Sequence, residues 1–278
     1  MIVTVTLNPS LDEWVWLPSL DVGALNRAAA FARYPGGKGI NVSRVVLELG
    51  GLTLAHAFSG GEDGVILRRA LAAMGIPCEF VEVKGTTRNN YKILSQRPRA
   101  LTEINAAGPR LSAGPLLVLE RRLLRQATRP SVVALSGSLP PGVPSTTYQR
   151  WIRRLRRQGV PVALDTSGAA LRHGLAARPW MIKPNRQEAE ALVGFRLTRR
   201  EAAVRAVRQL LRRGPQLVVL SLGAEGALLA SNAPAGVWWA RPPAVTVDSA
   251  VGAGDSLVAG FLVGWVRGHG VLEAFRLG

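Results

Sequence analysis

Apolar side chains gather in short runs along the chain, and these runs predict buried β-strands. Each run is rich in β-branched or other large apolar residues and is bounded by glycine, proline or polar residues, as the strands of a covered sheet are. The predicted strands lie at residues 2–7, 54–58, 132–135, 160–164, 180–183 and 217–220.

Between these strands, apolar positions recur every three or four residues, which predicts amphipathic helices. The predicted helices lie at 64–74, 146–158, 187–193 and 198–213, and a further one follows the glycine-rich turn at 36–39. Strands that alternate with helices imply a mainly parallel sheet with helices on both faces. Ligands of such sheets bind beyond the carboxyl ends of the strands.

Two regions break this alternation. Residues 12–17 and 27–34 have the pattern of short strands, and residues 87–94 with 101–105 have the pattern of a hairpin. We expect these four segments to form a small sheet that projects from the main one as a lid over the site. Because no internal repeat and no low-complexity linker interrupts the chain, residues 1–278 are predicted to form a single domain.

The formal net charge of +17 comes almost entirely from 31 arginines, against four lysines. The arginines cluster at 120–129, 150–157 and 196–213, where apolar residues recur at helical spacing, so we interpret them as solvated faces of amphipathic helices. Aromatic residues are only 6% of the chain and no nucleic-acid-binding motif is found. We therefore expect no nucleic-acid partner, although such a role stays open, and the charge should attract anionic substrates.

The single cysteine, Cys78, excludes an intramolecular disulfide framework and a multi-cysteine zinc site. The first residues lack the basic and apolar regions of a signal peptide. The longest apolar stretch, residues 257–266, is interrupted by glycines and is too short to cross a bilayer. These features predict a cytoplasmic protein with no membrane partner.

The segment Val251-Gly-Ala-Gly-Asp-Ser256 precedes a predicted helix at 257–265 and carries the most specific chemistry. Backbone N–H groups at Gly252, Ala253 and Gly254 could converge on an anion, assisted by the helix dipole. Asp255 could take a proton from a hydroxyl that attacks phosphorus. Taken alone, this turn also fits an ordinary helix cap formed by an aspartate.

A second glycine-rich turn, Gly36-Gly-Lys-Gly-Ile-Asn41, lacks the spacing of a Walker A loop. By itself it fits a tight strand-to-helix turn as well as a ligand loop. Lys38 and Asn41 would suit a phosphorylated or hydroxylated ligand.

These segments, together with several others in the same order, resemble the PfkB (ribokinase-like) carbohydrate kinase family. The matching segments are 6–12 (TLNPSLD), 36–41, 87–93 (TRNNYKI), 102–105 (TEIN), 136–142 (SGSLPPG), 165–168 (DTSG), 183–188 (KPNRQE), 221–223 (SLG) and 252–256. The resemblance runs from residue 2 to about residue 265 and is strongest to the 1-phosphofructokinase and tagatose-6-phosphate kinase group. It implies a ribokinase-like three-layer α/β fold, with a mainly parallel sheet and a small β-sheet lid.

The resemblance also implies a role for each residue that matches a family motif. Asp255 corresponds to the catalytic base, with Gly252, Ala253 and Gly254 as its anion hole. The implied sugar-phosphate ligands are Asp12, Gly37 and Asn41 for the hydroxyls, Lys38 and Arg88 for the phosphate, and Ser136 and Ser138 beside them. Asp165 is interpreted as support for its loop and is not included.

On the nucleotide side, Asn185 and Glu188 match the family's NxxE element, which organises magnesium through water near the phosphates of ATP. The resemblance places Lys183, Ser221 and Gly223 where the nucleotide would lie. The implied cofactors are thus ATP and Mg²⁺.

The implied reaction is transfer of the γ-phosphoryl group of ATP to a ketohexose phosphate. The preferred acceptor is fructose 1-phosphate, which would give fructose 1,6-bisphosphate. Tagatose 6-phosphate kinase and 6-phosphofructokinase activities are the alternatives within the family. A catalytically weak sugar-phosphate-binding protein is an alternative of another class, because the chain ends sooner than its relatives and Ala250 replaces a usual hydroxyl residue. The resemblance also implies a homodimer formed through the lid, because relatives often pair these small sheets edge to edge. Trp14 and Trp16, on one face of a lid strand, favour a covered surface there.

Overall fold

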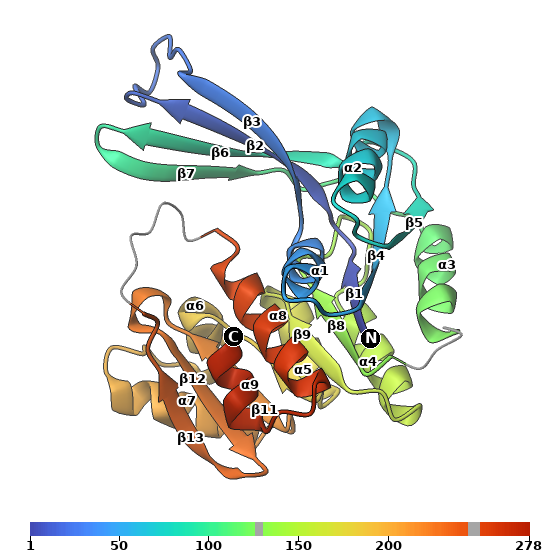
Figure 1. Ribbon diagram of the computed structural model, residues 1–278, viewed down its shortest axis with the longest axis vertical. Coiled ribbons are helices and arrows are strands. Elements are labelled where there is room, and N and C mark those ends of the chain that lie inside the picture. The colour runs from blue at the N-terminus through green and yellow to red at the C-terminus, as the bar shows by residue number, and fades with distance from the viewer. Residues whose placement is uncertain (126–129, 244–250) are drawn as a thin grey trace.

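The computed structural model describes residues 1–125, 130–243 and 251–278, and its largest element is a nine-stranded sheet in the order β13-β12-β11-β10-β9-β8-β1-β4-β5 (Figure 1). Neighbouring strands are parallel except at β12 and β13, which run antiparallel. The strands are β1 (Ile2–Thr6), β4 (Thr53–Ser59), β5 (Cys78–Glu82), β8 (Val132–Ser136), β9 (Val162–Asp165), β10 (Met181–Ile182), β11 (Leu217–Ser221), β12 (Ala227–Asn232) and β13 (Ala235–Ala240).

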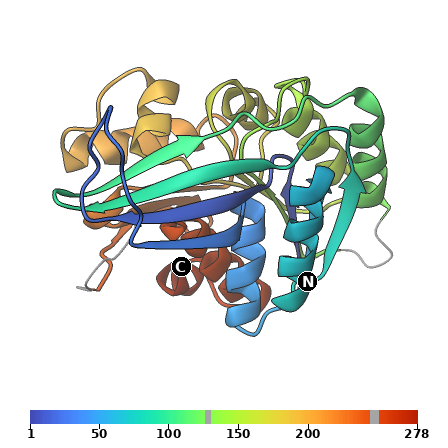
Figure 2. The same ribbon diagram turned by 90° about the horizontal axis from the view of Figure 1, so that it is seen from above.

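Helices cover both faces of this sheet, so the predicted three-layer α/β fold is confirmed (Figure 2). One face is covered by α1 (Lys38–Glu48), α2 (Gly61–Ala73), α8 (Ala253–Val266) and α9 (Val271–Leu277). The other face is covered by α3 (Ala113–Leu124), α4 (Thr147–Arg157), α5 (Gly168–Ala176), α6 (Arg186–Val193) and α7 (Arg200–Leu211). Two apolar layers result, because successive residues of each strand point to opposite faces.

The small second sheet was also predicted, and it has the order β3-β2-β6-β7. Its strands are β2 (Ser10–Leu17), β3 (Ala30–Gly36), β6 (Arg88–Gln96) and β7 (Arg99–Asn105). The strand predicted at 27–34 instead starts at Ala30, where pairing with β2 begins opposite Trp16, and it continues to Gly36 opposite Ser10. Pro18 follows β2 and has no backbone N–H with which to prolong the ladder.

Several elements differ from the sequence-based prediction. The hairpin β12–β13, the edge strand β5 and the helices α5 and α9 were not predicted, and of α3 only the part from residue 120 was predicted. The strand predicted at 160–164 begins only at Val162, because Pro161 precedes it, and the one predicted at 180–183 is reduced to β10. The predicted basic helical stretch at 120–129 is described only to residue 125, and both residues 126–129 and Ala250 lie outside the described residues.

The arginine-rich helices present their charges to solvent, as predicted. On α4, Arg153 and Arg157 are exposed, whereas Trp151, Ile152 and Leu155 are buried. This separation is what an amphipathic helix requires. Within the described ranges, no helix is long and apolar enough to cross a membrane.

Candidate active site

Asp255 lies in the first turn of α8 and is the buried carboxylate around which the site is built. Its side chain is 6% exposed, and its Oδ2 accepts a hydrogen bond from Asn41 Nδ2 over 2.8 Å. Burial, followed by the charge of Asp165, raises the pKa of Asp255 to about 6. The bond from Asn41 and the charges of Lys38 and Lys183 oppose this rise. A carboxylate with such a pKa is ionised at neutral pH and is still basic enough to accept a proton.

The turn before Asp255 opens α8 with Gly252 in the left-handed region, at φ 83°. This conformation is costly for other residues, so the glycine is needed here. The carbonyl of Gly252 accepts hydrogen bonds from the amides of Asp255 and Ser256. The amides of Ala253 and Gly254 are in the first helical turn, where N–H groups have no acceptor in their own helix. Such amides, together with the helix dipole, could bind an anion next to the carboxylate.

Asp165 joins two lysines next to Asp255, although it was not predicted to belong to the site. Its Oδ1 accepts a hydrogen bond from Lys38 Nζ at 2.9 Å, and its Oδ2 lies 3.4 Å from Lys183 Nζ. The pKa of Lys38 is raised, because the charge and hydrogen bond of Asp165, with smaller effects of Asp255 and Glu188, outweigh the effect of burial. Asp165 therefore contacts two of the predicted site residues, although it was itself left out of the predicted site.

The glycine-rich turn at 36–39 lets α1 approach the end of β1 closely. Gly37 has φ 118°, and a Cβ there would lie 2.7 Å from Thr6 Cγ2. No larger residue fits without displacing β1, and α1 then begins with Lys38 at the carboxyl edge of the sheet. This tight turn places Lys38 and Asn41 at the site.

Asp12 projects from β2 and is held in place by polar neighbours. Its Oδ1 accepts hydrogen bonds from Ser10 Oγ at 2.8 Å and from Asn90 Nδ2 at 3.0 Å. A Cβ on Gly36 would lie 2.5 Å from the same oxygen, so the glycine on the neighbouring strand leaves room for the carboxylate. The lid therefore carries an oriented acceptor at its base, as the sugar-hydroxyl assignment requires.

Arg88 opens the next lid strand, β6, and is half-buried. Its guanidinium donates to two backbone carbonyls, those of Ala106 at 2.8 Å and Asn8 at 2.9 Å, and its Nε is buried without a hydrogen-bond partner. No ion pair within the described ranges includes Arg88, whereas Lys38 is already paired with Asp165. Burial lowers the pKa of Arg88, and Asp12 opposes this effect. An oriented guanidinium without a carboxylate partner is suited to bind phosphate.

Ser136 is the last residue of β8, and Ser138 follows it at the same edge of the sheet. Ser138 Oγ accepts a hydrogen bond from Asn8 Nδ2 at 3.1 Å, while Ser136 Oγ is buried without a partner. Asn8 also has a buried, unpaired Oδ1. Asn8 was not predicted to be a site residue, although it lies in the matching segment 6–12 and links the lid side to the β8 loop.

Asn185 and Glu188 form a capping box at the start of α6. Asn185 Oδ1 accepts from the Glu188 amide, and Glu188 Oε2 accepts from the Asn185 amide, both at 2.9 Å. The second carboxylate oxygen of Glu188 is not part of this box. An amide and a carboxylate are the hard oxygen donors that Mg²⁺ prefers, and Mg²⁺ keeps most of its waters, so the two residues fit a water-mediated role. Within the described ranges, no cluster of three or more His, Cys, Asp or Glu could ligate a metal directly.

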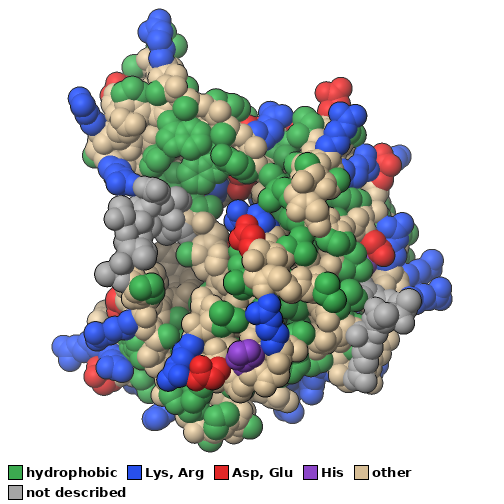
Figure 3. All heavy atoms as spheres, viewed as in Figure 1, with side chains coloured by type: hydrophobic (Ala, Val, Ile, Leu, Met, Phe, Trp, Pro, Cys, Tyr) green, Lys and Arg blue, Asp and Glu red, His purple; other side chains and the backbone are tan. Residues whose placement is uncertain are grey.

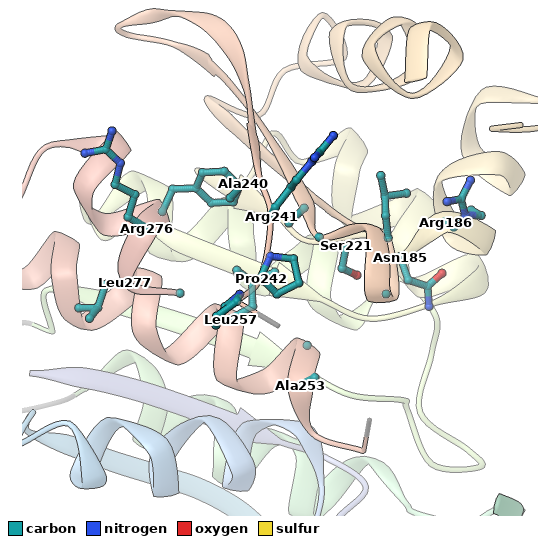
Figure 4. Close-up of a pocket in the computed structure, with 18 of the residues that line it drawn as sticks. Asn185, Arg186, Ser221, Ala240, Arg241, Pro242, Ala253, Leu257, Arg276 and Leu277 are labelled. Atoms are coloured by element: carbon teal, nitrogen blue, oxygen red, sulfur yellow. The ribbon is translucent and has the colours of Figure 1, made fainter. Parts of the chain in front are cut away.

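A pocket of about 880 Å³ lies between α8 and α9 on one side and β11 to β13 on the other (Figure 4). Five residues predicted for catalysis or nucleotide binding line it: Asn185, Ser221, Gly223, Ala253 and Gly254. The wall also includes Leu257, Pro242 and Phe275, which can cover a planar base. Lys183 and Glu188 lie outside this lining, but Lys183 Nζ is 3.2 Å from where a Cβ on Gly254 would be.

Besides the residues that line the pocket, six predicted or adjoining side chains form two groups at the same edge of the sheet. Asp255, Asn41, Lys38 and Lys183 surround the start of α8, next to the large pocket. Asp12 and Arg88 lie at the base of the lid.

Comparison with known proteins agrees with this arrangement. Residues 6–278 match the pfkB family carbohydrate kinase model. The chain is 38% identical to the 1-phosphofructokinase of Bacillus subtilis (strain 168), over all of this chain and 90% of that protein. Phosphofructokinase-2 from Escherichia coli in complex with fructose-6-phosphate has 32% identity and a TM-score of 0.92, covering 99% of this chain and 90% of the other. A structure of the same enzyme described as its tetrameric inhibited form also has a TM-score of 0.92, at 33% identity, covering 99% and 89%. The chain belongs to the pfkB family of carbohydrate kinases.

Proposed function

We propose that this kinase transfers the γ-phosphoryl group of ATP to the free primary hydroxyl of fructose 1-phosphate, giving fructose 1,6-bisphosphate and ADP. The observation that carries the proposal is the buried Asp255, with a pKa of about 6, at the N-terminus of a helix beside a large pocket. The identity to a 1-phosphofructokinase over the whole chain favours this acceptor.

In the proposed reaction, Asp255 accepts the proton of the attacking hydroxyl. The hydroxyl oxygen forms a new bond to the γ-phosphorus, and the bond between that phosphorus and the bridging oxygen of ATP breaks. The amides of Ala253 and Gly254 stabilise the charge on the transferred group. Lys183, beside Gly254, adds a positive charge at the same place.

The acceptor would lie between the base of the lid and α1. Asp12, Gly37 and Asn41 would hold the sugar hydroxyls, and Arg88 and Lys38 would bind the phosphate already on the sugar, with Ser136 and Ser138 nearby. Of the two cations, Arg88 is the stronger candidate, because its guanidinium has no carboxylate partner among the described residues.

The nucleotide would occupy the large pocket, against Asn185, Ser221 and Gly223. Asn185 and Glu188 would hold Mg²⁺ through its water shell. Bound there, the ion would neutralise charge on the ATP phosphates.

Fructose 6-phosphate is the second candidate acceptor, because the phosphofructokinase-2 structure that matches this fold is a complex with fructose-6-phosphate. Tagatose 6-phosphate remains a third possibility. A coupled assay of ADP release with fructose 1-phosphate, fructose 6-phosphate, tagatose 6-phosphate and free fructose decides among them. We expect the highest kcat/KM with fructose 1-phosphate. A best substrate without a phosphate would contradict the proposal.

If calorimetry detects sugar-phosphate binding but no binding of ATP with magnesium, the protein is a sugar-phosphate-binding protein rather than a kinase.

We also propose that the chain acts as a single domain in the cytoplasm and forms a homodimer through the lid. Phe31, Tyr91 and Ile104 are 59%, 43% and 54% exposed, and the strand register places them on one face of the lid sheet. Hydrophobic side chains gather on the surface of the lid in Figure 3. Trp14 and Trp16, which were predicted to favour a covered surface, stack on the opposite lid face and are half-buried.

A further inference from the structure

The carboxylate of Asp165 lies between the two lysines nearest to Asp255, and the proposed transfer gives it no part. Asp165 is the last residue of β9 and is 2% exposed. Its two oxygens face different lysines: Oδ1 faces Lys38 Nζ at 2.9 Å, and Oδ2 faces Lys183 Nζ at 3.4 Å. One buried anion is thus shared by two cations.

The two lysines come from opposite sides of the site. Lys38 begins α1, directly after the turn that leads down from the lid strand β3. Lys183 follows β10, is 3% exposed and reaches the start of α8 at Gly254. A single carboxylate at the end of β9 therefore connects the acceptor side of the site with the donor side.

The local charges also balance around this carboxylate. Asp165 and Asp255 supply two negative charges, Lys38 and Lys183 supply two positive ones, and Asn41 adds a neutral hydrogen bond. Glu188 on α6 also favours the charged form of Lys38, with a smaller effect than Asp165 or Asp255. Loss of one member of this set would leave a buried charge without its partner, which is costly. The remaining side chains would then tend to move away from their present positions.

We propose that Asp165 is a positioning residue, which holds Lys38 and Lys183 on either side of the base and sets the electrostatic environment in which Asp255 works. Its importance for catalysis rests on the proposed kinase function, but its effect on Asp255 does not. Asp165 is the largest contribution after burial to the raised pKa of Asp255, whereas the hydrogen bond from Asn41 lowers that pKa. Loss of the Asp165 charge should therefore lower the midpoint of the Asp255 titration, and loss of the Asn41 hydrogen bond should raise it.

The test is a pH titration of the free protein labelled with [4-¹³C]aspartate and followed by NMR. The chain has only six aspartates, and the Asp255 signal is identified by its absence in Asp255→Asn. In Asp165→Asn we expect the midpoint of Asp255 to fall by about one pH unit or more. Asp165→Glu, which keeps the charge, should stay near the wild type, and Asn41→Leu should raise the midpoint. An unchanged midpoint in folded Asp165→Asn would overturn the proposal.

Steady-state kinetics test the positioning role separately. In Asp165→Asn, kcat should fall by about tenfold or more, and KM should rise for both sugar phosphate and ATP, because both lysines lose their common partner. Asp165→Glu should recover part of kcat. A defect in Asp165→Asn that excess magnesium fully restores would contradict the positioning role and would assign Asp165 to the metal instead. Because the NMR titration needs no substrate, failure of this proposal is distinct from failure of the substrate assignment.

Discussion

Asn41 Nδ2 donates a hydrogen bond to Asp255 Oδ2 across 2.8 Å, joining two residues that are 214 positions apart in the chain. The bond stabilises the ionised carboxylate and so opposes the burial that raises its pKa. With the pKa held at about 6, Asp255 is mostly ionised at neutral pH. The packing of α1 against α8 thus limits how far burial and Asp165 raise the pKa of the proposed base.

The first prediction concerns pH. Because the folded pKa of Asp255 lies above its ordinary value, the group binds a proton as the pH falls through about 6, and the protonated form cannot act as a base. We expect kcat/KM, which reports ionisation of the free enzyme, to fall about tenfold for each pH unit well below this value. A kcat/KM that stays constant down to pH 5 in a folded enzyme would argue against Asp255 as the base.

The second prediction concerns Arg88. Arg88→Ala should raise KM for fructose 1-phosphate by about tenfold or more and change kcat less, because it removes a contact made with the ground state and the transition state alike. The preference for phosphorylated over free sugar should also shrink. Arg44→Ala, an exposed change on α1, is the matched control and should leave both constants near wild type. If KM in Arg88→Ala is unchanged, the acceptor phosphate binds elsewhere, and Lys38 is the next residue to test.

The third prediction concerns magnesium. Glu188→Gln keeps the hydrogen bond to the Asn185 amide but removes the negative charge, so the concentration of magnesium needed for half-maximal activity should rise by about tenfold or more. Glu190→Gln on the same helix is the control, since Glu190 binds Arg196 and the amide of Leu197 rather than the site. An equal effect of both changes would show that only helix α6 was disturbed.

The fourth prediction concerns the lid. A charge at Phe31 should disfavour burial of the apolar lid face, so Phe31→Asp should weaken the proposed dimer by about tenfold or more in sedimentation equilibrium. Leu52→Asp, another exposed apolar residue but away from the lid, should leave the association unchanged. A wild-type chain that sediments as a monomer at micromolar concentration would refute the dimer.

The alternation of strands and helices could be predicted because strands covered on both faces need continuous apolar runs, as in β1 and β8. The edge of the sheet does not have this signature. β5 carries exposed Glu79 and Glu82, and the edge strand β13 begins with Ala235-Gly236 and has no buried residue. These elements are stabilised by pairing with a neighbouring strand rather than by their own pattern.

The site residues were predicted mainly from short glycine-rich segments, because a tight turn that requires glycine can be recognised in the sequence itself. Asp165 opens the matching segment DTSG at 165–168 and ends a buried strand, where parallel sheets gather their ligands. Its contacts could not be predicted, because its partner Lys38 is 127 positions away and only folding brings them together. The orientation of the lid faces was likewise beyond the sequence, since alternation separates two faces without saying which one remains exposed.

The most direct test of the proposed mechanism is the kcat of Asp255→Asn with ATP and fructose 1-phosphate. Asparagine keeps the size and the hydrogen bond from Asn41 but cannot accept the proton, so kcat should fall by about 10²–10⁴-fold while sugar-phosphate affinity changes little. The variant should be at least as stable as wild type, because it removes a buried charge whose pKa is raised on folding. A folded Asp255→Asn enzyme that turns over at a near-normal rate would contradict the mechanism.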